Sequence, residues 1–242
     1  MEASLSALAP QLQQARPGPL VPVLPALRAL LPQRGLRPGT AVSVGGDTAL
    51  LLTLASAATA AGTWCGAIGL GGLGLVAAAE LGVRLDRFVL VESPGERWPE
   101  VVAAMADAFG ILLVRPVGPV GGAVAARLGA VARRTGCVLL VAGPWPGAQV
   151  CLEVVDRSWT GVGRGRGRLR ARRIQVTAAG RGAAARSRTV ALWLPDENGT
   201  ISPVEPLVTG TGPVADGTPV TAGSPVASSP VATGARAPLA VV

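Results

Sequence analysis

The order of apolar and polar runs along the chain predicts a layered α/β fold. From about residue 41 to residue 142, short β-branched or apolar runs alternate with longer segments whose apolar residues recur at helical spacing. Such alternation is typical of a parallel sheet covered on both faces, because each crossover between parallel strands needs a helix. We expect strands at Ala41–Val44, Trp64–Ile68, Arg87–Val91, Ile111–Val114 and Cys137–Ala142. We expect helices at Thr48–Ala61, Leu73–Leu81, Trp98–Phe109 and Ala123–Thr135.

The pattern changes near residue 150, where helical spacing stops. The runs "VCLEVVD", "RLRARRIQV" and "SRTVALWLP" follow one another with only turns between them. We expect antiparallel strands that extend one edge of the sheet. After Pro195 the chain is rich in Gly, Pro, Ser, Thr, Ala and Val, and it cannot bury enough apolar surface to offset chain entropy. The sequence therefore predicts a disordered tail over residues 196–242.

The first residues form a separate segment. Leu5, Leu8 and Leu12 recur at helical spacing ahead of the breaker run "RPGP", and a second short helix is expected at Leu24–Pro32. The Leu5, Leu8 and Leu12 face either packs on its own domain or docks a partner protein. The predicted organisation is an arm over residues 1–19, an α/β domain over residues 20–195, and the tail.

A membrane span is a rival interpretation of one stretch. Thr48–Ala79 carries no charged residue and is long enough to cross a bilayer. However, glycines interrupt it, and it also divides into a helix, a buried strand and a second helix, which is the arrangement we favour. The N-terminus has Glu2 and no basic segment ahead of an apolar core, which argues against a secretory signal.

Composition removes several classes of chemistry. Of the 242 residues 49% are hydrophobic and the net charge is +8, yet all 22 basic residues are arginine. Without lysine or histidine the chain cannot form histidine metal clusters, histidine catalytic pairs or a lysine Schiff base. Three widely spaced cysteines, Cys65, Cys137 and Cys151, suggest neither a disulfide framework nor a zinc site. We expect a cytoplasmic protein with no cofactor, no metal and no catalytic residue.

The stretch "SVGGDTALLL" has the position of a phosphate-binding loop but not its chemistry. Gly45, Gly46, Asp47 and Thr48 stand between the first strand and the first long helix. A phosphate-binding loop needs more residues and a lysine that neutralises the phosphate. Here the loop is shorter, and Asp47 places a negative charge where the phosphate would bind. We expect Asp47 to cap the helix.

The ends of two further strands lack the residues that bind a nucleotide or its magnesium ion. Arg115 and Pro116 follow the strand that ends at Val114, where an ATPase presents an aspartate to magnesium. The run Gly69–Gly74 superficially suits a dinucleotide, but it follows the second strand and lacks the acid downstream. These departures favour a degenerate site.

Positive charge is concentrated in one segment. Between Arg157 and Pro195 the sequence has ten arginines and no acidic residue, so the remainder of the chain has a small excess of acids. Arginine clamps phosphates bidentately, and the nearby Trp159 and Trp193 could stack on unpaired bases. The alternatives are an acidic protein partner or an ordinary solvated face. The candidate contact residues are Arg164, Arg166, Arg168, Arg170, Arg172 and Arg173.

The order of these segments resembles the RecA recombinase core. Leu24–Gly46 is similar to the approach to its phosphate loop, and Trp64–Ser93 is similar to its second strand, following helix and third strand. "WPEVVAAMADAFGILLVRP" resembles its Walker B region, and "RLRARRIQV" resembles the arginine-rich strand after its second DNA loop. The resemblance implies a RecA-like three-layer core with a mainly parallel sheet and an antiparallel extension, in which the three catalytic elements are lost.

Among RecA relatives, this sequence most resembles the ImuA-type accessory proteins of the inducible mutagenesis cassette. The features that carry the resemblance are the absence of lysine and the segments "LLVAGPWPGA" and "GRGRGRLRARRI". This resemblance implies a non-enzymatic adaptor in DNA-damage-induced translesion synthesis. Its implied partners are the inactive Y-family polymerase homologue ImuB, indirectly an error-prone replicative-type polymerase, and single-stranded or damaged DNA at the nucleoid. The alternatives are a SulA-like regulator of cell division and a degenerate nucleotide-binding protein of the ATPase fold.

Overall fold

The computed structural model describes residues 19–163 and 166–204. The helices are α2 (Thr48–Ala60), α3 (Leu75–Glu80), α4 (Trp98–Met105) and α5 (Gly122–Thr135), with 3₁₀ turns η1 (Pro25–Leu30), η2 (Leu85–Arg87), η3 (Gly95–Arg97) and η4 (Gly182–Ala184). The strands are β1 (Ala41–Gly45), β2 (Cys65–Ile68), β3 (Phe88–Val91), β4 (Ile111–Val114), β5 (Val138–Ala142), β6 (Val150–Trp159), β7 (Val162–Gly163), β8 (Arg166–Gly167), β9 (Arg172–Gly180), β10 (Arg188–Trp193) and β11 (Ser202–Pro203).

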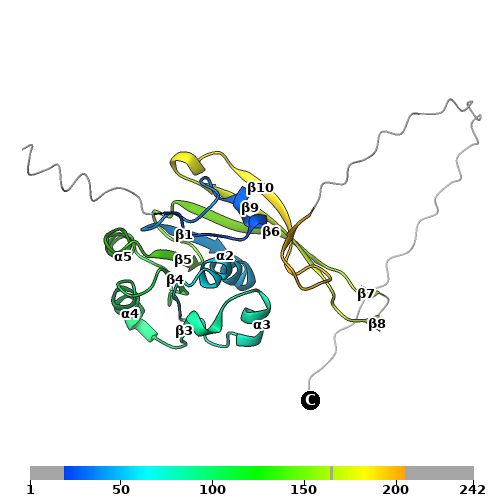
Figure 1. The fold of residues 1–242 in the computed structure, drawn as a ribbon. Coiled ribbons are helices and arrows are strands. Elements are labelled where there is room, and N and C mark those ends of the chain that lie inside the picture. The colour runs from blue at the N-terminus through cyan, green and yellow to red at the C-terminus, as the bar shows by residue number, and fades with distance from the viewer. Residues whose placement is uncertain (1–18, 164–165, 205–242) are drawn as a thin grey trace, which may run out of the picture. The chain divides into compact units, whose positions relative to one another are not determined.

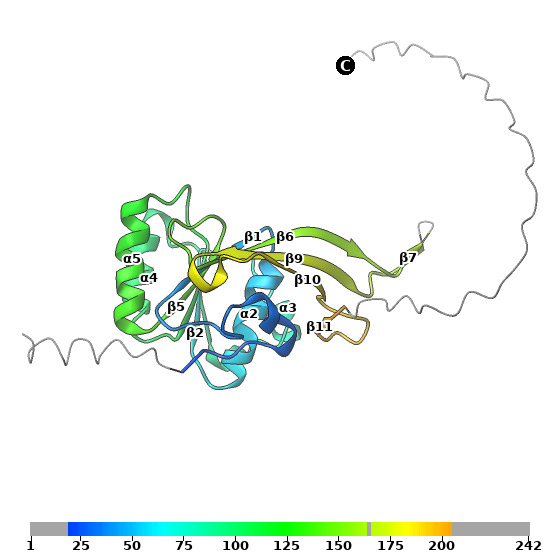
Figure 2. The same cartoon turned by 90° about the horizontal axis from the view of Figure 1, so that it is seen from above.

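Within the described residues, the main sheet has the strand order β11-β10-β9-β6-β1-β5-β4-β2-β3. The six strands from β6 to β3 in this order run parallel, and β9, β10 and β11 pair in antiparallel fashion (Figure 1). The helices α4 and α5 cover one face, while η1, α2 and α3 cover the other (Figure 2). The expected three-layer α/β core with a mainly parallel sheet and an antiparallel extension is therefore confirmed.

Two apolar cores explain why these segments fold into layers. On the α2 face, Leu27, Leu50 and Leu54 pack with Leu113 and Leu140 of the sheet. On the other face, side chains from α4 and α5 pack against alternate residues of the same strands. That second core includes Trp98, Val102, Leu128, Leu112 and Leu139. Neighbouring residues of β4 and β5 point to opposite cores, so both faces of these strands are apolar, which is why their sequences are continuously hydrophobic.

The expected elements between residues 41 and 142 are present, with shorter ends in several places. α4 ends at Met105 rather than Phe109, and the segment Leu24–Pro32 forms only the 3₁₀ turn η1. The stretch Thr48–Ala79 divides into α2, β2 and part of α3. Among the residues that the structure describes, no helix is both long enough and apolar enough to cross a membrane.

The second half confirms one expectation and corrects another. The three runs beginning with "VCLEVVD" form β6, β9 and β10, which are antiparallel to one another, and β6 joins them to the parallel part by pairing in parallel with β1. The ordered domain also continues beyond Pro195 to Val204, since β11 pairs with β10. Asp196 organises this turn by accepting hydrogen bonds from the N–H groups of Asn198 and Thr200, which composition alone does not reveal. Residues 205–242 of the predicted tail lie outside the described residues.

Candidate functional site

The loop between β1 and α2 is a helix cap rather than a phosphate cradle. β1 ends at Gly45, and Gly46 turns the chain with a φ of +76°, a conformation that favours glycine. Asp47 is the N-cap of α2, and its carboxylate accepts a hydrogen bond of 2.9 Å from the backbone N–H of Leu50. The predicted capping role of Asp47 is thus confirmed. A negative group already occupies the helix N-terminus, where a nucleotide phosphate would otherwise be attracted.

The second oxygen of this carboxylate pairs with a buried arginine. The side chains of Asp47 and Arg172 are 4% and 11% exposed, and they form an ion pair between the loop and β9. The guanidinium of Arg172 also lies 5.7 Å from the ring centre of Trp159 on β6. Because both charges are largely removed from water, losing either partner would leave an uncompensated buried charge.

A β-bulge in β6 brings two side chains to the same face. Val154 lies opposite Val176 on β9, whereas Asp156 lies opposite Gln175, so Val155 is an extra residue. The bulge shifts the alternation by one residue and places Arg157 and Trp159 on the face of the buried Val154 and Ile174. Arg157 then donates a hydrogen bond of 3.3 Å to the carbonyl oxygen of Gly46.

The two positions that would hold magnesium in an ATPase lie next to each other, but one of them is an arginine. Arg115, directly after β4, donates a hydrogen bond of 2.8 Å to the hydroxyl of Thr48, at the beginning of α2. In an ATPase this hydroxyl and an acid after that strand would serve magnesium, which prefers oxygen ligands. A guanidinium cannot bind a cation. Over the described ranges, no group of three or more candidate metal ligands is found.

A second acid lies against the loop from the opposite face of the sheet. A side-chain carbon on Gly45 would overlap the carboxylate of Glu153, which lies beside it in the β1–β6 register. A larger residue at Gly45 would therefore require the carboxylate end of the Glu153 side chain to move. Sequence reasoning missed Glu153 and Arg157, because their places near the loop depend on strand pairing and on the bulge.

The strands β6 and β9 continue past the body of the domain and form an arm with β7 and β8 near its tip (Figures 1 and 2). Of the predicted contact residues, Arg168, Arg170 and Arg173 have exposed side chains on this arm. Arg172 needs correction as a free contact residue, because Asp47 neutralises it. Arg166 lies in β8, and Arg164 lies outside the described residues, as do Leu5, Leu8 and Leu12.

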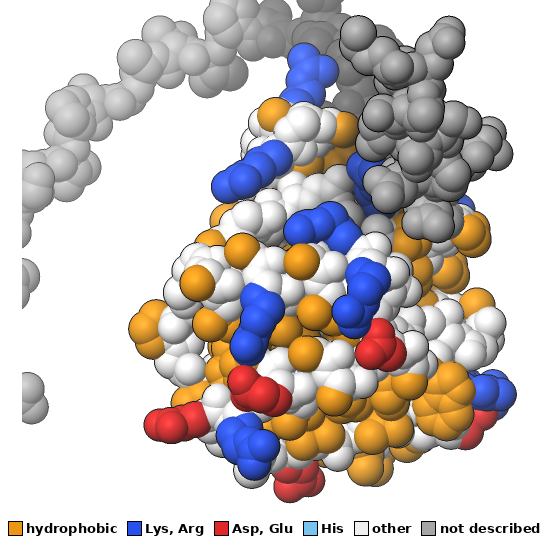
Figure 3. Space-filling view, turned by 90° about the vertical axis from the view of Figure 1, so that its left-hand side faces the viewer, with side chains coloured by type: hydrophobic (Ala, Val, Ile, Leu, Met, Phe, Trp, Pro, Cys, Tyr) orange, Lys and Arg blue, Asp and Glu red, His pale blue; other side chains and the backbone are white. Residues whose placement is uncertain are grey.

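Stacking on the two predicted tryptophans is only partly available. Trp159 is half exposed and lies beside Arg172, while Trp193 is at the end of β10 and partly buried. On the side that carries α4 and α5, most basic side chains lie in the upper part of the view, while the lower part shows acidic side chains with some basic ones beside them (Figure 3). Positive charge is therefore not confined to the arm.

The buried thiols of Cys65 and Cys137 have low reactivity. Burial raises the pKa of Cys137 to about 12, and burial together with the nearby Cys137 raises the pKa of Cys65 further. Both thiols are therefore protonated near neutral pH and are poor nucleophiles. Cys151 is exposed.

Comparisons with known proteins place the chain near a mycobacterial relative. Residues 29–147 match the family model described as the MT3502 N-terminal domain. The uncharacterized protein Rv3395c of Mycobacterium tuberculosis (strain ATCC 25618 / H37Rv) is 35% identical over 140 residues. The match covers 57% of this chain and 65% of that protein, so the chain spans less than two thirds of the relative's length.

Among solved structures, the flagellar accessory protein FlaH of Methanocaldococcus jannaschii is similar at a TM-score of 0.47 and 9% sequence identity. The similarity covers 72% of this chain and 94% of that protein.

Proposed function

We propose that this protein is a RecA-like adaptor that holds other proteins together in DNA-damage-induced translesion synthesis and does not cycle nucleotide. The observation that carries the proposal is the carboxylate of Asp47 at the N-terminus of α2, held there by Leu50 N–H and by Arg172. A nucleotide phosphate at this place would meet a like charge and would have to break a buried ion pair. The fold is thus preserved while its nucleotide chemistry is replaced by internal contacts.

The proposed partner is the ImuB-type inactive homologue of a Y-family polymerase, and through it an error-prone replicative-type polymerase. The support for this choice is the ImuA-type resemblance of the sequence. The Leu5, Leu8 and Leu12 face is the proposed docking segment, because its apolar residues recur at helical spacing ahead of a breaker.

The decisive experiment is co-expression with the ImuB homologue of the same organism, followed by size-exclusion chromatography at about 0.5 M salt, where purely electrostatic contacts are screened. We expect a stoichiometric complex that is lost when residues 1–16 are deleted. A matched control replaces Gln11, Gln13 and Gln14 by alanine, which leaves the three leucines intact. Separate elution of the two full-length proteins would overturn the adaptor proposal.

The arm is the proposed contact with single-stranded or damaged DNA. Arg168, Arg170 and Arg173 are exposed and have no carboxylate partner among the described residues. Replacing these three by glutamine should weaken binding and lower its salt dependence, by a slope of about 0.7 for each phosphate contact to a single strand. Unchanged binding would refute this part of the proposal.

The rival functions predict different results. A degenerate nucleotide-binding protein would bind ATP stoichiometrically in a filter or thermal-shift assay, whereas we expect no binding at the β1–α2 loop. A SulA-like regulator would change FtsZ polymerisation without needing a polymerase partner. Either positive result, combined with separate elution from ImuB, would replace the adaptor proposal.

A further inference from the structure

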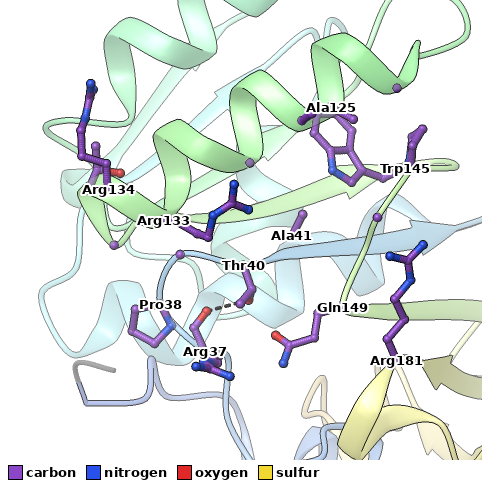
Figure 4. A pocket seen from close by; sticks show the side chains of 18 residues that line it. Arg37, Pro38, Thr40, Ala41, Ala125, Arg133, Arg134, Trp145, Gln149 and Arg181 are labelled. Carbon is purple, nitrogen blue, oxygen red and sulfur yellow. Dashed lines mark hydrogen bonds between the residues drawn. The ribbon is translucent and has the colours of Figure 1, made fainter. Parts of the chain in front are cut away.

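A second basic site lies at the opposite end of the sheet from the β1–α2 loop. A cavity of about 1040 Å³ opens at the amino ends of β1 and β6, beside the last turn of α5 (Figure 4). Arg37, Arg133, Arg134 and Arg181 line it from three separate segments, and no Asp or Glu is among its lining residues. These arginines lie far apart in the sequence, so no single run marks the cavity.

The backbone holds the arginine-bearing segments in place. The N–H of Arg181 bonds to the carbonyl of Gln149 at 3.1 Å, and the N–H of Gln149 bonds to the carbonyl of Ala41 at 2.9 Å. On the other side, the N–H of Gly39 bonds to the carbonyl of Gly136 at 3.1 Å, which fixes the Arg37 turn against the end of α5. The cavity is therefore largely organised before any ligand arrives, which lowers the cost of binding.

Three of the four guanidinium groups have no carboxylate partner among the described residues. Arg134 pairs with Asp107 at 3.3 Å, and Figure 4 shows its side chain directed away from the cavity. Arg37, Arg133 and Arg181 have exposed side chains with no carboxylate partner among the described residues. Compensation of the α5 macrodipole accounts for arginines in its last turn, but it does not account for Arg37 or Arg181, which lie on other elements.

We propose that this cavity binds the phosphate backbone of a nucleic-acid strand, at a site distinct from the arm. Arginine forks match phosphate oxygens, and the amide of Gln149 adds a further donor to the lining, whereas the hydroxyl of Thr40 already donates a hydrogen bond of 2.6 Å to the carbonyl of Arg37. A magnesium-bound nucleoside triphosphate fits less well, because the lining has no carboxylate for the metal. Trp145 is only 7% exposed and packs on Trp98, so it offers no free face for a base. Binding is therefore independent of base sequence.

The test measures binding of a fluorescent single-stranded DNA of about 20 nucleotides by anisotropy, over a range of salt concentrations. The cavity variant is R133Q/R181Q. The matched control is R28Q/R97Q, which removes the same charge from exposed positions outside the cavity. Neither Arg133 nor Arg181 makes a side-chain hydrogen bond among the described contacts, so the cavity variant should unfold at the same temperature as the control.

We expect the cavity variant to bind about tenfold or more weakly near 0.1 M salt, and its salt slope to fall by about 1.4, which corresponds to two phosphates. The control should keep the slope of the original chain. Repeating the comparison in an R168Q/R170Q/R173Q background separates this proposal from the proposed role of the arm, because the loss must persist there. Equal slopes for cavity and control variants in both backgrounds would overturn it, as would displacement of DNA from the cavity by polyglutamate at equal charge concentration.

Discussion

Breaking the contact between Asp47 and Arg172 should destabilise the domain far more than losing a surface ion pair. Asp47→Asn keeps a side chain that caps helices well but removes the charge that neutralises Arg172, which is 11% exposed. Breaking a buried pair from one side costs about 3–5 kcal/mol. For a domain of this size, that corresponds to a fall in melting temperature of roughly 6–20 °C. Asp47→Ala also loses the cap and should cost about 1 kcal/mol more.

Thermal and urea unfolding of four proteins would measure the coupling: the original chain, Asp47→Asn, Arg172→Met and the double variant. The double variant should recover most of the loss, because replacing both partners of a buried pair is often nearly neutral. The matched control is Asp86→Asn, which breaks the exposed pair of Arg84 and Asp86 and should leave the melting temperature unchanged. A coupling energy below about 0.5 kcal/mol would refute the reasoning, since independent sites are additive within that limit.

Three further predictions concern other parts of the fold. Burial raises the pKa of Cys137 to about 12 and that of Cys65 further, so both stay protonated at pH 8, and a thiol reagent should label only Cys151 until denaturant exposes all three. Deleting Val155 should remove the bulge and its local bend but leave Arg157 opposite Ile174 and Trp159 opposite Arg172, so tryptophan fluorescence should change little, and a large change would contradict the assigned register. Hydrogen bonds from Thr200 lower the pKa of Asp196 from its ordinary value of 3.8. The ionised carboxylate therefore stabilises this turn above pH 3.8, and the stabilisation is lost as the pH falls through the lowered pKa. Hydrogen exchange over residues 196–204 should become faster at that low pH.

The parallel half of the fold could be predicted because its local signals agree. Apolar runs such as Ile111–Val114 are buried on both faces, and the intervening segments carry helical spacing, so elements between residues 41 and 142 were identified within a few residues. Asp47 was also identified correctly as a cap, since a short polar residue before an apolar helix has few other uses.

The second half depended on pairing that the sequence does not display. Whether β6 runs parallel to β1 is decided by the course of the loop 143–149, which crosses from one end of the sheet to the other. The bulge at Val155 reverses the alternation that a period-two pattern would assign. Arg172 consequently looked like one more exposed charge in a basic run. The cavity at Arg37, Arg133 and Arg181 likewise depends on contacts between distant segments.

The carboxylate at the start of α2 has a consequence for timing. A nucleotide bound at such a position would be hydrolysed or released. The rate of that loss would set how long the bound state of the protein lasts. Asp47 belongs to the chain and cannot diffuse away, so its effective concentration beside Leu50 N–H and Arg172 is constant. If the proposed function is correct, the ion pair that joins the β1–α2 loop to β9 is kept at every ATP concentration. For the proposed adaptor, the lifetime of its complexes would then depend on synthesis, degradation and partner dissociation, and not on a catalytic turnover.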